Sequence, residues 1–370
     1  MHVNTIKRPL ITIVTHPIDK KVVFFGCLLD SDERYDALQK KLASIDRGET
    51  FLDPYQAVLS LVTQEMDPNR WESKGLIPIP DWLHPLPPDS SKPQLTSSEI
   101  ITFIDRNGCR VAADEVGRFI EKEVFPNIPC LIAVDHCLTG EVYRRVAQRH
   151  APEETALVVL DSHTDAVPMS ILAPAIQYDA ENNPDSVHDP EDPLLYDRPD
   201  SYNAGSFLYN LLVEGVVLPR NLYLLGISDY PPKQAFRLKD ERIKNYVNFF
   251  RELKNTGVTL VTKDELSSSP SRVRRILEGI KTPYLYVSVD MDIGARNALE
   301  GVRFLDRQGL NEPQLFRLIG YLREVLDRGV KLAGLDLTEF NPRQAGLDQT
   351  YPIAAQIIKN LLAAVYSPPL

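Results

Sequence analysis

Two aspartates and a histidine alternate directly after an apolar run of the sequence. Asp161, His163 and Asp165 stand two positions apart and follow Leu157–Leu160, a predicted buried strand. Because alternate residues of an extended chain point to the same side, we expect these side chains to converge at the end of the strand. Two carboxylates and an imidazole suit a divalent metal ion. The alternative interpretation is a loop of polar turn residues.

Two further motifs repeat this arrangement. Asp290 and Asp292 follow the predicted strand Tyr284–Val289, and His136 follows Cys130–Val134. Carboxylates that meet at a strand end repel one another unless a cation lies between them, although one such pair could also cap a helix. A lone histidine is more often packed or capping, but three motifs at strand ends favour a metal centre. The six candidate ligands are His136, Asp161, His163, Asp165, Asp290 and Asp292.

The number and type of these ligands indicate which metal they would hold. Six ligands exceed the three that a catalytic zinc ion typically keeps. They suit two ions that share carboxylate ligands and a water molecule. Because the set offers oxygen and imidazole but no thiolate, it favours manganese over zinc. The sequence therefore predicts a centre of two Mn²⁺ ions per chain.

The elements that must position these residues alternate along the chain. Short apolar runs, typical of strands buried on both faces of a parallel sheet, are separated by amphipathic helical patterns. This alternation predicts a wound α/β fold. The expected strands are Leu10–Thr15, Val22–Leu28, Cys130–Val134, Leu157–Leu160, Leu222–Ile227, Val258–Val261, Tyr284–Val289 and Leu332–Leu335. The expected helices are Asp32–Ile45, Thr139–Arg149, Ser206–Glu214, Ser271–Ile280, Glu312–Arg328 and Tyr351–Tyr366.

Two segments interrupt this alternation. Leu76–Pro93 is rich in proline and is incompatible with a regular helix or a central strand. Ala180–Tyr202 is acidic and proline-rich, and a loop of this length inside a compact domain is usually functional or disordered. We predict an N-terminal portion with its proline-rich connection over residues 1–95, packed onto the main domain over residues 96–370.

Composition excludes several classes of function. The chain has 370 residues, of which 51 are acidic and 41 are Lys or Arg, and its formal charge is -10. This acidic balance argues against a broad nucleic-acid-binding face, and no run of roughly 18 apolar residues predicts a membrane span. The beginning of the sequence lacks the features of a signal peptide, and the cysteines form no Cys-x-x-Cys pair. We therefore predict a reduced, cytoplasmic protein. The four cysteines are Cys27, Cys109, Cys130 and Cys137.

In their order along the chain, the motifs resemble those of the ureohydrolase superfamily of arginase, agmatinase and formimidoylglutamase. The matching elements are Asp135-His136, Asp161–Asp165, Ser288–Asp292 and the C-terminal run Asp336–Pro342. The resemblance covers about residues 128–366. It implies a three-layer α/β/α fold with a mainly parallel, arginase-like central sheet, and it makes a homo-oligomer plausible because relatives commonly form trimers or hexamers.

The resemblance also implies roles for individual residues. The six candidate ligands fall on the family's ligands to a binuclear manganese centre, whose bridging hydroxide attacks the carbon of an amidine or guanidine. Asp165 would accept the nucleophile's proton and pass it to the leaving nitrogen. Glu339 falls on the glutamate that pairs with the substrate's guanidinium, a charge-assisted contact; its alternative role is a carboxylate at a helix start. The implied substrate is a small guanidino or amidino cation.

The chain departs from the family pattern in three places. Ala133-Val134 replaces two glycines before the first ligand, and Asp292–Asn297 lacks the family's second Asp-Pro pair. A family histidine assigned to proton transfer falls on Ala204, and neither Ala204 nor the neighbouring Asn203 can carry a proton at neutral pH. His188, in the acidic loop, is a possible substitute. Asn203 and His188 are therefore secondary candidates for substrate contact.

Three functions stay open on the sequence alone. The first is a manganese-dependent hydrolase of linear amidine or guanidine C–N bonds. The second is a catalytically altered or inactive metal-binding relative, which Ala204 and the altered stretch Asp292–Asn297 motivate. The third is a metal-dependent amide deacetylase. The complete ligand set favours a binuclear centre, and Glu339 favours a cationic substrate over an acyl one.

Overall fold

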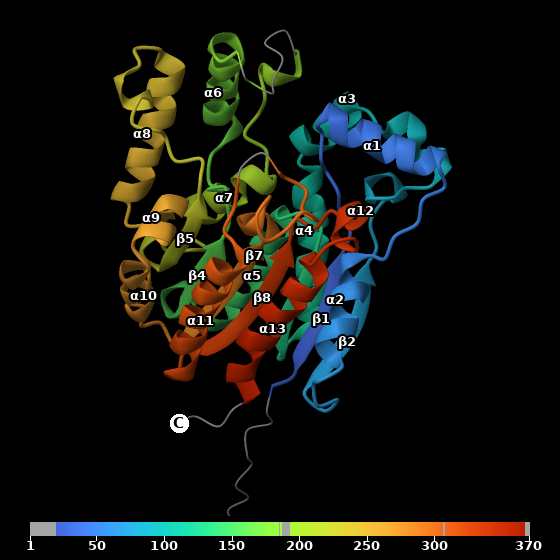
Figure 1. The fold of residues 1–370 in the computed structure, drawn as a ribbon, viewed down its shortest axis with the longest axis vertical. Coiled ribbons are helices and arrows are strands. Elements are labelled where there is room, and N and C mark those ends of the chain that lie inside the picture. Colours follow the sequence, from blue (N-terminus) through green and yellow to red (C-terminus); the bar gives the residue numbers. More distant parts are fainter. Residues whose placement is uncertain (1–19, 185, 187–192, 306–307, 367–370) are drawn as a thin grey trace, which may run out of the picture.

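The apolar runs of the sequence form one parallel sheet at the centre of the protein. In a computed structural model, which describes residues 20–184, 186, 193–305 and 308–366, this sheet has eight strands in the order β2-β1-β3-β8-β7-β4-β5-β6 (Figure 1). Neighbouring strands pair in parallel throughout, as the alternation of strands and helices predicts. The strands are β1 Val22–Cys27, β2 Trp71–Ile77, β3 Ile128–Ala133, β4 Thr155–Leu160, β5 Leu222–Ile227, β6 Thr259–Thr262, β7 Tyr284–Asp290 and β8 Lys331–Thr338.

Helices cover both faces of the sheet and complete the three layers. Alternate residues of a strand face opposite sides, so Val22 and Phe24 of β1 lie on the face covered by α2, α10, α11 and α13, whereas Val23 and Phe25 lie on the face covered by α4, α5, α7 and α8. The helices are α1 Tyr35–Asp46, α2 Pro54–Thr63, α3 Ser97–Asp105, α4 Gly108–Phe119, α5 Cys137–His150, α6 Met169–Asn182, α7 Phe207–Val213, α8 Glu241–Asn255, α9 Lys263–Ser268, α10 Pro270–Glu278, α11 Glu312–Asp327, α12 Pro342–Ala345 and α13 Thr350–Tyr366.

Several elements are absent from the sequence prediction. Strand β2 is an edge strand with mostly half-buried residues, so its sequence WESKGLI lacks the apolar run of a central strand. Helix α6 includes the first residues of the segment 180–202, which the sequence predicts as a loop. The predicted strand Leu10–Thr15 lies outside the described residues. The division of the chain at residue 95 stays a prediction.

The strand order brings the chemical motifs together. Strands β3, β8, β7 and β4 are neighbours in the middle of the sheet, although they are far apart in the sequence. Parallel strands end at the same edge, which is where ligands bind in open α/β sheets. The motifs that follow these four strands therefore share one edge. Among the described residues, no helix has the length and apolar character needed to cross a membrane.

Candidate metal centre

One histidine and three aspartates converge at this edge of the sheet. The Nδ1 atom of His136, just after β3, lies 2.7 Å from Asp165 Oδ2, 3.2 Å from Asp290 Oδ2 and 3.3 Å from Asp161 Oδ2. All four side chains are buried, and one potential ligand atom from each lies within 4.8 Å of the others. These four side chains form a compact group of potential metal ligands.

A second cluster adjoins the first and shares one aspartate with it. Asp161, His163 and Asp292 also offer ligand atoms within 4.8 Å of one another. His163 Nδ1 lies 2.9 Å from Asp292 Oδ2 and 3.7 Å from Asp161 Oδ1. The His163 side chain is 26% exposed, whereas the two aspartates are buried. The structure therefore brings all six predicted ligands into two adjoining groups, and His163 is the most exposed of the six.

Backbone amides hold one oxygen of each of three aspartates. Asp161 Oδ1 accepts a hydrogen bond from His163 N at 2.6 Å. Asp290 Oδ1 accepts one from Asp292 N at 2.8 Å, and Asp292 Oδ1 accepts one from Ser162 N at 3.1 Å. In each case Oδ2 is the oxygen that lies beside an imidazole. The loops thus fix the carboxylates so that their second oxygens meet inside the cluster.

Other polar groups orient the His136 ring. Its Nε2 lies 2.9 Å from Ser288 Oγ, which donates a hydrogen bond to Asp336 Oδ1 at 2.6 Å. Tyr286 donates a second hydrogen bond to Asp336. Partners of this kind fix the orientation and tautomer of a histidine ligand. Nδ1 of His136 is consequently the nitrogen that faces the three aspartates.

Burial and the neighbouring charged groups shift the pKa values of the residues in the first group. Burial raises the pKa of Asp161 and Asp290 well above the usual value, and neighbouring carboxylates raise it further. For His136, burial opposes the charged form, but the three neighbouring aspartates hold the pKa well above its usual value. Asp161 Oδ2 is buried and accepts no hydrogen bond from the described part of the chain. An arrangement of this type is stabilised by a cation between the carboxylates.

Glu339, after β8, lies against the first group but is already paired with a cation. Its Oε1 accepts hydrogen bonds from His136 N at 2.8 Å and from Arg303 Nη1 at 3.3 Å. Burial raises the pKa of Glu339 well above its usual value, against the opposing effect of Arg303. The other oxygen, Oε2, is buried and has no hydrogen-bond partner among the described residues. Glu339 therefore offers one free carboxylate oxygen next to the cluster.

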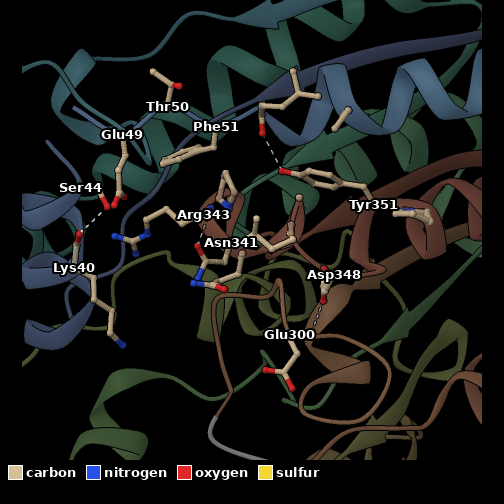
Figure 2. A pocket seen from close by; sticks show the side chains of 18 of the residues that line it. Lys40, Ser44, Glu49, Thr50, Phe51, Glu300, Asn341, Arg343, Asp348 and Tyr351 are labelled. Atoms are coloured by element: carbon tan, nitrogen blue, oxygen red, sulfur yellow. Dashed lines mark hydrogen bonds between the residues drawn. The ribbon is translucent and has the colours of Figure 1, made fainter. Parts of the chain in front are cut away.

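Arg303 is one of two site residues that were not predicted from the sequence. Its side chain is 7% exposed, and Nη1 also donates to Asp135 Oδ2 at 3.2 Å. Its backbone N donates to the carbonyl of Glu339 at 2.9 Å. The preceding residues are held by Asp348, which accepts hydrogen bonds from the amides of Glu300 and Gly301 at 2.7 and 3.0 Å (Figure 2). The only signal in the sequence is an arginine in the loop after Ser288–Asp292, where the chain departs from the family pattern.

The secondary candidates have no such position in the structure. Asn203 and Ser206 form a capping box at the short 3-10 helix Ala204–Ser206, and Asn203 Nδ2 donates to the carbonyl of Ser201. These contacts are local, and its contact with a substrate stays a prediction. His188 lies outside the described residues.

Asp229 is the second site residue that was not predicted from the sequence. It follows β5 and accepts hydrogen bonds from Thr164 N at 2.9 Å and from Thr164 Oγ1 at 2.6 Å. Burial raises the pKa of Asp229, and the nearby His163 opposes that shift. Asp229 thereby fixes the loop that carries His163 and Asp165.

The family of the chain follows from its sequence as a whole. A model of the Arginase family matches residues 99–364. The chain belongs to the arginase family. This match covers all six clustered residues together with Glu339 and Arg303. The family resemblance inferred from the motifs is thereby confirmed, as is the arginase-like fold.

Solved structures of this family share the fold at low identity. Proclavaminate amidino hydrolase from Streptomyces clavuligerus is 19% identical, with a TM-score of 0.58, and the match covers 94% of this chain and 93% of that one. Arginase from Bacillus subtilis is 15% identical, with a TM-score of 0.54 and coverage of 95% and 100%. Trypanosoma cruzi formiminoglutamase, determined with Mn²⁺, is 12% identical, with a TM-score of 0.54 and coverage of 96% and 97%. No curated protein sequence matches the chain.

Proposed function

We propose that this arginase-family member is a metal-dependent hydrolase of the C–N bond of a linear amidine or guanidine. The observation that carries the proposal is the pair of donor groups that share Asp161. The first group would hold one divalent ion through His136, Asp165 and Asp290, and the second would hold another through His163 and Asp292. The relatives of known structure include an amidino hydrolase, an arginase and a formiminoglutamase.

The donor chemistry fits a pair of Mn²⁺ ions. Four aspartates contribute a charge of about -4, which two divalent cations would cancel, and imidazole and carboxylate ligands without thiolate suit manganese. Asp161 is placed to be a shared ligand, because its Oδ2 lies 3.3 Å from His136 Nδ1 in the first group and its Oδ1 lies 3.7 Å from His163 Nδ1 in the second. When bound, two such ions would lower the pKa of a water molecule and so supply hydroxide near neutral pH.

The protein's own residues would position the substrate and move the proton. Glu339 Oε2 would accept an N–H of the amidinium or guanidinium group, which places the substrate's carbon beside the clusters. Asp165 faces His136 at 2.7 Å and is only slightly exposed, so it is placed to take a proton from the nucleophile and return it to the leaving nitrogen. Ala204 provides no second proton carrier, so Asp165 would perform both transfers.

Arg303 gives a specific reason to consider a second function. Because it pairs with Glu339 Oε1, the carboxylate that would select a substrate guanidinium is partly neutralised by the chain itself. A relative that binds metal but has lost turnover would tolerate this pairing. The two possibilities differ in activity and not in metal content.

The decisive experiment combines metal analysis with a substrate screen. The purified chain is loaded with Mn²⁺, its metal content is measured by mass spectrometry, and guanidino and formimino compounds are assayed for release of urea, ammonia or formamide. We expect about two ions per chain and turnover of at least one compound. Bound metal without turnover would support the inactive relative, and the absence of bound metal would refute both functions.

A further inference from the structure

A cavity of about 1000 Å³ lies between helices α1, α2 and α12 and the beginning of α13 (Figure 2). Volumes of about this size are typical of sites for small ligands. Neither the six clustered side chains nor Arg303 and Glu339 line this cavity. It is therefore a space separate from the candidate metal centre.

Two segments that carry site residues form part of the cavity wall. Glu300 precedes Arg303 by three positions in one loop, and Asn341 follows Glu339 by two positions. Asn341 N donates a hydrogen bond to the carbonyl of Gly301 at 2.9 Å, so this contact joins the two segments. The cavity is thus a neighbour of the metal centre with a lining of its own.

Most charged side chains of the lining already have a partner. Arg47 Nε lies 2.6 Å from Glu49 Oε1, and Lys40 Nζ lies 2.9 Å from Asp36 Oδ2. Asp348 Oδ2 accepts hydrogen bonds from two backbone amides and one hydroxyl group. These contacts neutralise or stabilise the groups that take part in them.

Arg343, in α12, is the cation of the lining that lacks such a partner. Its Nη1 is buried and has no hydrogen-bond partner, and no ion pair joins its side chain to a described residue. Burial lowers the pKa of Arg343, against the opposing effects of Asp30, Asp32 and Glu49. In Figure 2 its side chain points across the cavity toward Glu49 and Ser44. A buried donor without a partner is rare in folded proteins and requires an explanation.

The carboxylates that attract Arg343 do not provide the missing partner. Each of the three has a closer cation of its own, at 2.8, 2.7 and 2.6 Å respectively. These ion pairs are Asp30–Lys41, Asp32–Arg34 and Glu49–Arg47. Arg343 is therefore a surplus cation, placed to meet an anion that the described part of the chain does not supply.

Apolar side chains provide another part of the lining. Phe51, Leu61 and Tyr351 contribute to the cavity wall. Leu52 and Leu347 also line it and are 54% and 81% exposed. A ligand in the cavity would remove part of this apolar surface from water, which favours binding.

We infer that this cavity is a second binding site, separate from the metal centre, for a small molecule that carries one anionic group on an apolar body. Arg343 would hold the anion through charge-assisted hydrogen bonds, in a planar geometry that suits a carboxylate or a phosphate. Phe51 and Tyr351 would contact the apolar body. The inference does not depend on the proposed hydrolase function, because neither the metal-ligand groups nor Glu339 takes part.

The test compares probes that differ in their polar group. 4-Phenylbutanoate, 3-phenylpropyl phosphate and the neutral 4-phenylbutanamide are titrated calorimetrically into the full chain, both loaded with Mn²⁺ and free of metal. We expect at least one anion to bind about tenfold or more tightly than the amide, at a site whose affinity is the same in both preparations. The tighter of the two anions identifies whether the site prefers a carboxylate or a phosphate.

Substitutions locate the binding in the cavity. Arg343→Met removes the charge and retains much of the apolar stem, so it should weaken binding of the anion about tenfold or more and leave the amide unchanged. Ala43→Phe places a ring in the cavity and should weaken all three probes. The control Arg317→Met removes a charge from an exposed position of α11 outside the cavity and should change none of the affinities.

Several results would overturn the inference. They are equal affinities for the anions and the amide, the absence of binding for all three probes, and an anion affinity that Arg343→Met leaves unchanged. Binding of the anion only in the Mn²⁺-loaded chain would place it at the metal centre and would also overturn the inference. Because no turnover is measured, failure of the proposed function would leave these results unaffected.

Discussion

The buried ion pairs of Arg303 lead to a quantitative prediction. Arg303 is 7% exposed and is shared by Asp135 and Glu339, with Asp30 at 3.8 Å. Replacing it with methionine retains much of the apolar stem but leaves these carboxylates without their common cation. Removal of one partner of a buried ion pair typically costs about 3–5 kcal/mol. We therefore expect Arg303→Met to lower the free energy of unfolding by an amount in this range.

The assay is equilibrium unfolding in urea, followed by fluorescence and by circular dichroism, on metal-free protein. Lys40→Met is the matched control, since its ion pair with Asp36 is exposed and spans one helical turn. Such a pair contributes about 0.3–0.5 kcal/mol. The double variant Arg303→Met with Glu339→Gln removes one uncompensated charge, so it should be more stable than Arg303→Met alone. A loss below about 1 kcal/mol for Arg303→Met would refute the reasoning.

Three further changes test the site and its surroundings. Asp161→Asn removes the residue shared by both donor groups and should reduce bound Mn²⁺ from two ions to one or none, measured by mass spectrometry; full loading would contradict the sharing. Ser288→Ala removes the contact that orients His136 and should weaken Mn²⁺ binding by about 10–100-fold in a calorimetric titration. Burial opposes ionisation of Asp30, yet Lys41 and Arg303 lower its pKa to about 2. This carboxylate therefore stabilises the fold above its unfolded pKa, and that stability is lost as the pH falls toward about 2. Between about pH 5 and pH 3 the free energy of unfolding of metal-free wild type should fall by about 1 kcal/mol more than that of Asp30→Asn, and equal falls would contradict the shift.

Much of the fold could be predicted from the sequence because its central strands have a strong signal. Strands β3, β4 and β7 are buried along almost their whole length, so most of their residues are apolar. Strand β2 lies at the edge and has mostly half-buried or exposed residues without a regular alternation, so nothing in its composition separates it from a loop. Helix α8 is amphipathic, but its charged residues outnumber its core positions. A buried strand is therefore easier to find than an edge strand or a surface helix.

The six clustered side chains could be predicted for a related reason. Asp161, His163 and Asp165 follow one strand within five residues, so their spacing alone indicates that they share a surface. No such spacing links Arg303 to Glu339, which is 36 residues away. Their contact depends on the path of the loop after β7 and on the positive φ of 63° at Glu339. A contact of this kind is visible only in the folded chain.

The placement of Arg303 sets the charge that a substrate would meet. Glu339 has one oxygen on Arg303 and the other without a partner, so a guanidinium would bind it through one N–H and not through the usual bidentate fork. A single contact of this kind provides less selection for a cation than a free glutamate would. If the proposed function is correct, this chain would therefore select a cationic substrate less strongly than a relative whose glutamate has both oxygens available.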